Sequence, residues 1–88
     1  MKLILYSKPG CHLCEGLQEK LERLAGVGDL DFELEMRDIT TRAEWFEVYQ
    51  YEIPVLCCDR EGIEHPLPRP SPRASDSHIS RLLRQYSS

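Results

Sequence analysis

Two cysteines, Cys11 and Cys14, have two residues between them and lie where an apolar strand pattern changes to a helical pattern. The turn residues Pro9 and Gly10 come directly before the first of them. A helix N-terminus carries unpaired N–H groups and a partial positive charge, and both favour a thiolate over a thiol. This position therefore predicts a redox-active dithiol in which Cys11, nearest the helix dipole, is the nucleophile.

The predicted chemistry is thiol–disulfide exchange. Cys11 attacks a substrate disulfide and forms a mixed disulfide, and Cys14 then displaces the product and leaves the Cys11–Cys14 bond. We expect Cys14 to be the more buried of the two, and we expect Lys8 and a protonated His12 to stabilise the thiolate. No metal or other cofactor is required, because the two sulfurs carry the electrons.

The elements that position this pair are read from hydrophobic periodicity. Residues 2–6 form an apolar run that predicts a strand buried on both faces. Residues 11–25 have leucines at three- and four-residue steps, which predicts an amphipathic helix that ends at a glycine-rich stretch. Gly16 lies inside this helix, at a cost of about 1 kcal/mol relative to alanine. Complete alternation over residues 30–37 predicts an edge strand with one covered and one wet face.

The second half of the chain continues the alternation of strands and helices. Thr41 and Glu44 have the spacing of a capping box, which predicts a short helix with Trp45, Val48 and Tyr49 on one face. Trp45 and Tyr49 are interpreted as core residues. Residues 53–58 predict a buried strand, and a turn at 59–62 leads to a partner strand at 63–65.

The C-terminal part is predicted to be an extended connector followed by a helix. Prolines alternate through residues 66–72 and forbid a helix there. Apolar residues at helical spacing then predict a helix from Ser75 or Asp76. The order is β-α-β-α-β-β-α, an α/β fold with a four-stranded mixed sheet flanked by helices.

Two segments resemble a known family. Residues 6–14, which read Tyr-Ser-Lys-Pro-Gly-Cys-His-Leu-Cys, resemble the active-site segment of glutaredoxins within the thioredoxin superfamily. Ile53 and Pro54 resemble that superfamily's cis-proline loop. The resemblance covers nearly the whole chain and is closest to small bacterial glutaredoxin-like proteins with a Cys-His-Leu-Cys tetrapeptide. It implies a single thioredoxin/glutaredoxin-like domain over residues 1–88, with Pro54 cis and packed against the dithiol and the backbone of Ile53 paired with substrate.

The sequence departs from the glutaredoxin pattern in two places. His12 and Leu13 replace the proline and tyrosine that usually stand between the cysteines, and the Gly-Gly-Asp segment that holds a glutathione carboxylate in that family has no counterpart in residues 64–70. Lys8 matches the family's basic residue, and Arg69 is a candidate carboxylate ligand. Glutathione and a thioredoxin-reductase-type enzyme therefore both stay open as electron donors, with a slight preference against tight glutathione binding.

Three other readings of the cysteines are weighed against dithiol exchange. A redox-inactive module could keep the fold and use its groove for a partner. A Cys₄ zinc site could combine the dithiol with Cys57 and Cys58, but neighbouring strand residues point to opposite faces and do not both reach one ion easily. An iron–sulfur cluster bridged by Cys11 of two subunits is implied only by the family resemblance. Cys57 and Cys58 are interpreted as small core residues.

Composition narrows the partners and the compartment. The 88 residues include 15 acidic against 11 basic side chains, a net charge of −4, which argues against nucleic acid or an anionic membrane as partner. The apolar run near the N-terminus is shorter than the roughly seven to fifteen residues of a secretory signal. We therefore expect a cytoplasmic, monomeric thiol–disulfide oxidoreductase that acts in electron transport, on disulfide-containing proteins or small-molecule disulfides.

Overall fold

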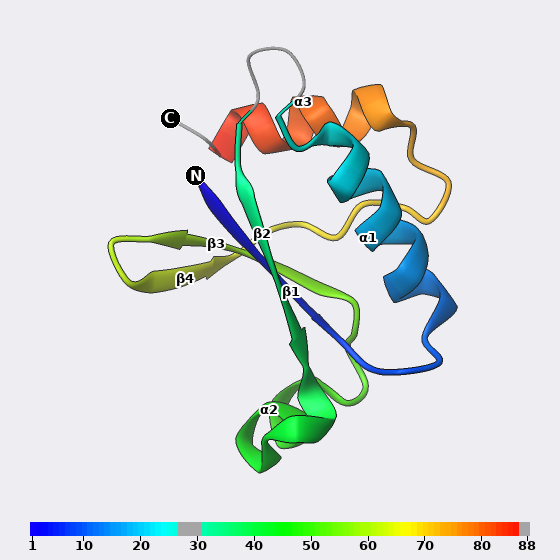
Figure 1. The fold of residues 1–88 in the computed structure, drawn as a ribbon, viewed down its shortest axis with the longest axis vertical. Coiled ribbons are helices and arrows are strands. Elements are labelled where there is room, and N and C mark those ends of the chain that lie inside the picture. The colour runs from blue at the N-terminus through cyan, green and yellow to red at the C-terminus, as the bar shows by residue number, and fades with distance from the viewer. Residues whose placement is uncertain (27–30, 87–88) are drawn as a thin grey trace.

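The computed structural model describes residues 1–26 and 31–86 of the chain, and it shows a mixed sheet with helices on both faces (Figure 1). The sheet has the order β2-β1-β3-β4; β1 and β2 are parallel and the other two pairs are antiparallel. Within the described part of the chain, no helix is long and apolar enough to cross a membrane. The elements in chain order are β1 (Lys2–Ser7), α1 (His12–Leu24), β2 (Glu33–Asp38), the 3₁₀ turn η1 (Ile39–Thr41), α2 (Ala43–Tyr49), β3 (Val55–Arg60), β4 (Ile63–Pro66) and α3 (Asp76–Tyr86). The predicted element order and the thioredoxin-like fold are confirmed.

One face of the sheet packs against α1 and α3, which lie together on the same side in Figure 1. Leu3 and Leu5 of β1 point to this face because alternate strand residues share a side. Leu21 of α1 and Leu83 of α3 are fully buried against them. This cluster is the larger of the two apolar cores and holds α1 against the end of β1, where the dithiol lies.

The opposite face packs against α2 and η1. Tyr6 of β1 stacks on Tyr49 with ring centroids 4.3 Å apart and meets Trp45 edge-on at 5.8 Å. Cys57 packs in this cluster, whereas Cys58 packs in the core beneath α1 and α3, and each is only 1% exposed. The two adjacent cysteines therefore do point to opposite faces, and both are core residues as predicted.

Strand β2 is an edge strand, as predicted. The exposure of its side chains, however, does not follow the predicted alternation of buried apolar and exposed polar residues. It begins at Glu33, and Leu30, where the predicted strand starts, lies outside the described residues. Phe32 is buried as expected, yet Met36 is 37% exposed. Arg37, expected on the wet face, has a side chain only 19% exposed.

The coverage of Arg37 comes from long-range contacts. Its guanidinium lies over the rings of Tyr6 and Trp45, at 5.5 and 5.3 Å from their centroids. It also donates to Glu64 on β4 at 2.9 Å and to Glu35 on its own strand. Cation–π contact and ion pairing thus cover the face that the alternation marked as solvated.

The predicted start of the second helix is wrong. Arg42, not Thr41, is the N-cap of α2, and it makes no capping side-chain hydrogen bond. Thr41 belongs to η1, where its hydroxyl donates to the carbonyl of Asp38 at 2.7 Å. Trp45 and Tyr49 pack against the apolar cluster on this face of the sheet, whereas Val48 is 60% exposed.

The bounds of β3, β4 and α3 differ from the predicted ones by at most two residues. β3 starts at Val55 rather than Ile53, because Pro54 has no N–H to join the ladder. β4 extends through Pro66, one residue further than predicted. Of the two candidate caps for α3, Ser75 serves: its hydroxyl oxygen accepts from the amide of His78 at 3.1 Å.

Candidate active site

Cys11 and Cys14 are joined by a disulfide, with their Cα atoms 5.3 Å apart. Cys11 is the N-cap of α1 and has an extended backbone, so Cys14 lies in the first turn of the helix. Cys14 is 2% exposed, whereas Cys11 is partly exposed. The pair therefore has an accessible sulfur at the surface and a covered sulfur one turn below it.

A tight turn delivers Cys11 to the start of the helix. The amide of Cys11 donates to the carbonyl of Lys8 at 3.3 Å, which closes a four-residue turn. Gly10, the third residue of this turn, has a φ of +81°, and Pro9 precedes it. Proline followed by a residue with positive φ is the pattern of a type II turn, which only glycine adopts at little cost.

The electrostatics at Cys11 favour negative charge. The amide of Cys14 donates to Sγ of Cys11 at 3.2 Å, and the dipole of α1 points its positive end at the same atom. A sulfur that accepts a backbone N–H bond at a helix N-terminus is stabilised as a thiolate once the disulfide is reduced.

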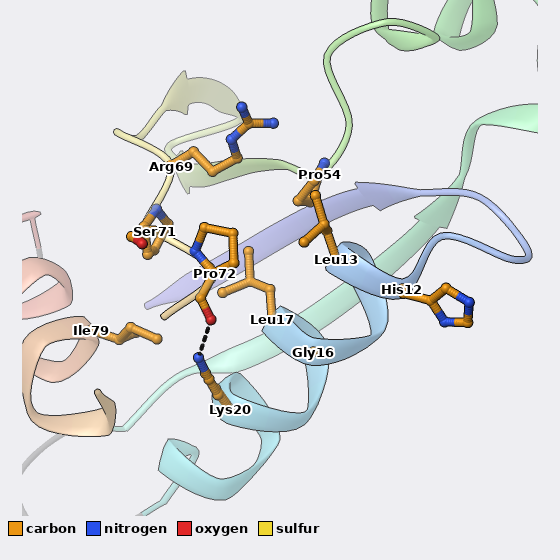
Figure 2. Close-up of a pocket in the computed structure, with 11 residues that line it drawn as sticks. His12, Leu13, Gly16, Leu17, Lys20, Pro54, Arg69, Ser71, Pro72 and Ile79 are labelled. Atoms are coloured by element: carbon orange, nitrogen blue, oxygen red, sulfur yellow. Dashed lines mark hydrogen bonds between the residues drawn. The ribbon is translucent and has the colours of Figure 1, made fainter. Parts of the chain in front are cut away.

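Lys8 and His12, the two residues predicted to stabilise the thiolate, have different surroundings. Lys8 is exposed, and it lines a shallow hollow with Cys14 and Asp38. The side chain of His12 is 93% exposed, and its Nδ1 lies 3.5 Å from a carboxylate oxygen of Glu15. Figure 2 shows the His12 side chain pointing away from the other residues that line a pocket with it. Thiolate stabilisation by either residue stays a prediction.

The loop before β3 carries the second predicted motif. The Ile53–Pro54 peptide bond is cis, as the resemblance implies. Pro54 lines the same pocket as His12 and Leu13, the two residues between the cysteines. The amide of Ile53 donates to the carbonyl of Tyr49 at 3.1 Å, so that amide is already engaged. Backbone pairing between Ile53 and a substrate stays a prediction.

Further residues meet beside the disulfide that sequence reasoning did not assign to the site. Gly16, Leu17 and Lys20 of α1 line this pocket together with the proline connector (Figure 2). Arg69, a candidate carboxylate ligand, also lines it and donates to the carbonyl of Glu52 at 3.1 Å. The sequence signal that could have indicated this pocket is Gly16, a glycine inside an otherwise regular helical pattern.

The remaining cysteines lie apart from the disulfide. Cys57 and Cys58 are free thiols, and burial raises the pKa of Cys57. In the part of the chain that the structure describes, no group of three or more histidine, cysteine or acidic side chains is arranged to hold a metal ion. Cys57 and Cys58, which the combined four-cysteine site weighed above would need together, pack on opposite faces of the sheet.

A comparison with protein families matches residues 2–84 to the Glutaredoxin-like domain (DUF836). The chain belongs to this glutaredoxin-like family. The match includes both the Cys11–Cys14 pair and the cis-proline loop, so the expectation from the resemblance is confirmed. Membership, together with the CxxC pair, supports a redox function in general terms.

Solved structures agree on the fold of this glutaredoxin-like domain. Thioredoxin 1 from Thermosipho africanus TCF52B aligns with a TM-score of 0.62 at 17% identity, over 98% of this chain and 93% of that one. The structural genomics target protein XcR50 from X. campestris aligns with a TM-score of 0.62 at 24% identity, over 94% of this chain and 96% of that one. A comparison with curated proteins finds no match.

Proposed function

We propose that this glutaredoxin-like domain is a thiol–disulfide oxidoreductase that reduces disulfides through a Cys11/Cys14 dithiol cycle. The observation that carries the proposal is the placement of Sγ of Cys11 at the start of α1, where it accepts a hydrogen bond from the amide of Cys14 while bonded to the sulfur of that residue. The same backbone amide would therefore donate to Sγ of Cys11 both in the thiolate before attack and in the disulfide afterwards.

The cycle balances with the two sulfurs alone. The thiolate of Cys11 attacks one sulfur of a substrate disulfide, which breaks the substrate S–S bond, forms a mixed disulfide and releases the first substrate thiolate. Cys14, deprotonated, then attacks Sγ of Cys11, releases the second substrate thiolate and forms the Cys11–Cys14 bond. Two electrons pass to the substrate, and its two thiolates take up the protons that the cysteines lost.

The difference in exposure supports this order of attack. Cys11 is accessible to a substrate, and Cys14, at 2% exposed, is reached only by a sulfur already held within the protein. Pro54 and Ile53 form the proposed rest for the substrate chain, and Lys8 and His12 are proposed to add positive charge near the thiolate. Either two glutathione molecules or a thioredoxin-reductase-type enzyme would return the disulfide to the dithiol.

The test uses the wild type and three variants, Cys11→Ser, Cys14→Ser and the control Cys58→Ala, in reduction of 2-hydroxyethyl disulfide. Cys11→Ser should lower turnover by at least about a hundredfold. Cys14→Ser should retain the first step and accumulate a mixed disulfide, visible by mass spectrometry, and Cys58→Ala should keep its turnover. Running the assay with glutathione plus its reductase, and separately with thioredoxin reductase, identifies the donor.

Two results would contradict the proposal. One is full activity in Cys11→Ser, and the other is failure of the Cys11–Cys14 bond to form when the reduced protein is mildly oxidised. A protein that shows no turnover with either donor would instead act as a binding module with the same fold.

A further inference from the structure

A pocket of about 180 Å³ lies beside the disulfide, between α1 and the connector 67–75 that joins β4 to α3. Figure 2 shows that Leu13 points toward Pro54, and that Leu17, Pro72 and Ile79 point toward one another across the hollow. The pocket therefore has apolar walls from three segments: the helix that carries the cysteines, the cis-proline loop, and the connector with α3.

Gly16 forms part of the pocket, and neither packing nor backbone geometry requires a glycine there. It lies in the interior of α1, and its φ is not in the positive range. A Cβ built on it meets nothing within 4 Å. A mid-helix glycine costs about 1 kcal/mol relative to alanine. The one property that only glycine supplies at this position is the empty space above the helix, which belongs to the pocket.

The connector wall is held in place by α1 itself. Nζ of Lys20 donates to the carbonyls of Pro72 and Ala74, both at 2.9 Å. Lys20 lies one turn beyond Gly16 on the same side of the helix. These two bonds hold the wall before any ligand arrives, so the pocket is already formed in the free protein and binding does not have to order it.

Size and charge restrict what the pocket takes. Pockets for whole small-molecule ligands usually measure about 300–1,000 Å³, so this one suits a single side chain. Among the described residues that line it, none is acidic, whereas Lys20 and Arg69 are basic. Glutathione carries two carboxylates and no apolar side chain, so it could meet the basic rim but would leave the apolar walls unfilled.

We propose that this pocket binds one apolar side chain of a polypeptide disulfide substrate, next to the half-cystine that joins Cys11, and that Gly16 keeps the pocket open. The inference rests on the proposed oxidoreductase function and names its substrate class. The mixed disulfide tethers the substrate at Cys11, directly before His12 and Leu13, which line the pocket. A substrate side chain close to the half-cystine is therefore the one best placed to enter it. The basic rim favours substrates with an acidic residue close by.

The test compares substrates on the wild type first. Five short peptides are prepared as symmetric disulfides: a parent with serine around its cysteine, and four with one leucine at each of the two positions on either side. At one position, leucine should raise kcat/KM about tenfold over the parent, from burial of its side chain. Glutathione disulfide should be reduced more slowly than that peptide.

Two variants then locate the effect. Gly16→Leu places a side chain in the pocket. The leucine preference, defined as kcat/KM for the best leucine peptide divided by kcat/KM for the parent, should fall about tenfold in this variant. Glu22→Leu places the same side chain on an exposed position of α1 away from the pocket and should leave this ratio unchanged. Thermal unfolding of both variants checks that each is folded.

The outcomes separate this inference from the function on which it rests. If no leucine peptide exceeds the parent, if glutathione disulfide matches the best peptide, or if Gly16→Leu keeps the leucine preference, the pocket does not select apolar side chains. If instead the wild type reduces neither the peptides nor 2-hydroxyethyl disulfide in a Cys11-dependent way, the oxidoreductase function itself is wrong and the inference falls with it.

Discussion

The amide of Cys14 donates to Sγ of Cys11 at 3.2 Å, so the residue proposed to resolve the mixed disulfide also stabilises the nucleophile through its backbone. This contact survives any change of the Cys14 side chain, because the backbone provides it. Substitution of the Cys14 side chain by serine therefore removes the resolving thiol and leaves the backbone hydrogen bond to Cys11 in place.

The first prediction concerns the reactivity of Cys11. In the reduced Cys14→Ser variant, Cys11 should be alkylated by iodoacetamide at neutral pH faster than a cysteine in an unfolded peptide, because the amide and the helix dipole remain and favour the thiolate. The rate of alkylation, followed at Cys11 by mass spectrometry, measures this. A rate no faster than that of the peptide cysteine would mean that the helix start does not activate this sulfur.

The second prediction concerns the two buried thiols. Cys57 and Cys58 are each 1% exposed, and burial raises the pKa of Cys57. In the reduced native protein, a thiol reagent should therefore modify the partly exposed Cys11 rapidly, and Cys57 and Cys58 only after unfolding in guanidinium chloride. Rapid modification of Cys57 or Cys58 in the native state, located by mass spectrometry, would show that one face of the sheet opens readily.

The third prediction contrasts two glycines close to the disulfide. Gly10→Ala places a side chain at a φ of +81° and should lower the free energy of unfolding by about 1–2 kcal/mol. Gly16→Ala meets nothing within 4 Å and should raise it by about 0.5–1 kcal/mol, because alanine favours the helix. Urea denaturation measures both, and equal effects of the two substitutions would contradict the turn geometry.

The fourth prediction concerns acid stability. Hydrogen bonds from Tyr6 at 2.5 Å and from Arg37 lower the pKa of Glu64 below its ordinary value of 4.5. A lowered pKa means that the carboxylate stabilises the fold above pH 4.5, and that this contribution is lost as the pH falls through the folded-state pKa.

The matched variant for this effect is Glu64→Gln. It should lower the free energy of unfolding at pH 7 by about 1 kcal/mol, a modest value because the side chain is 34% exposed. At pH 2.5 the difference from the wild type should shrink, because both side chains are then neutral. Urea denaturation at the two pH values measures this, and a difference that does not change with pH would show that the charge of Glu64 is not involved.

The sequence was sufficient for the dithiol and for most of the elements that carry it. A Cys-x-x-Cys pair between an apolar run and a leucine-spaced helix depends on contacts within one or two turns of chain, and periodicity reports these well. The failures occurred where a distant residue changed a local preference. Arg37 is covered by Tyr6, Trp45 and Glu64 although the alternation placed it on the wet face. Thr41 belongs to the turn closed by Asp38 and does not cap the helix.

By itself, the sequence determined that this protein has two cysteines at a helix start and two more in a buried strand, because spacing and alternation are local properties. Only the tertiary structure decided what surrounds the dithiol. The pocket beside Cys11 is assembled from α1, the cis-proline loop and the connector before α3, which are far apart along the chain. In the sequence, Gly16 only weakened the predicted helix, and it lines a pocket only because those segments pack above it.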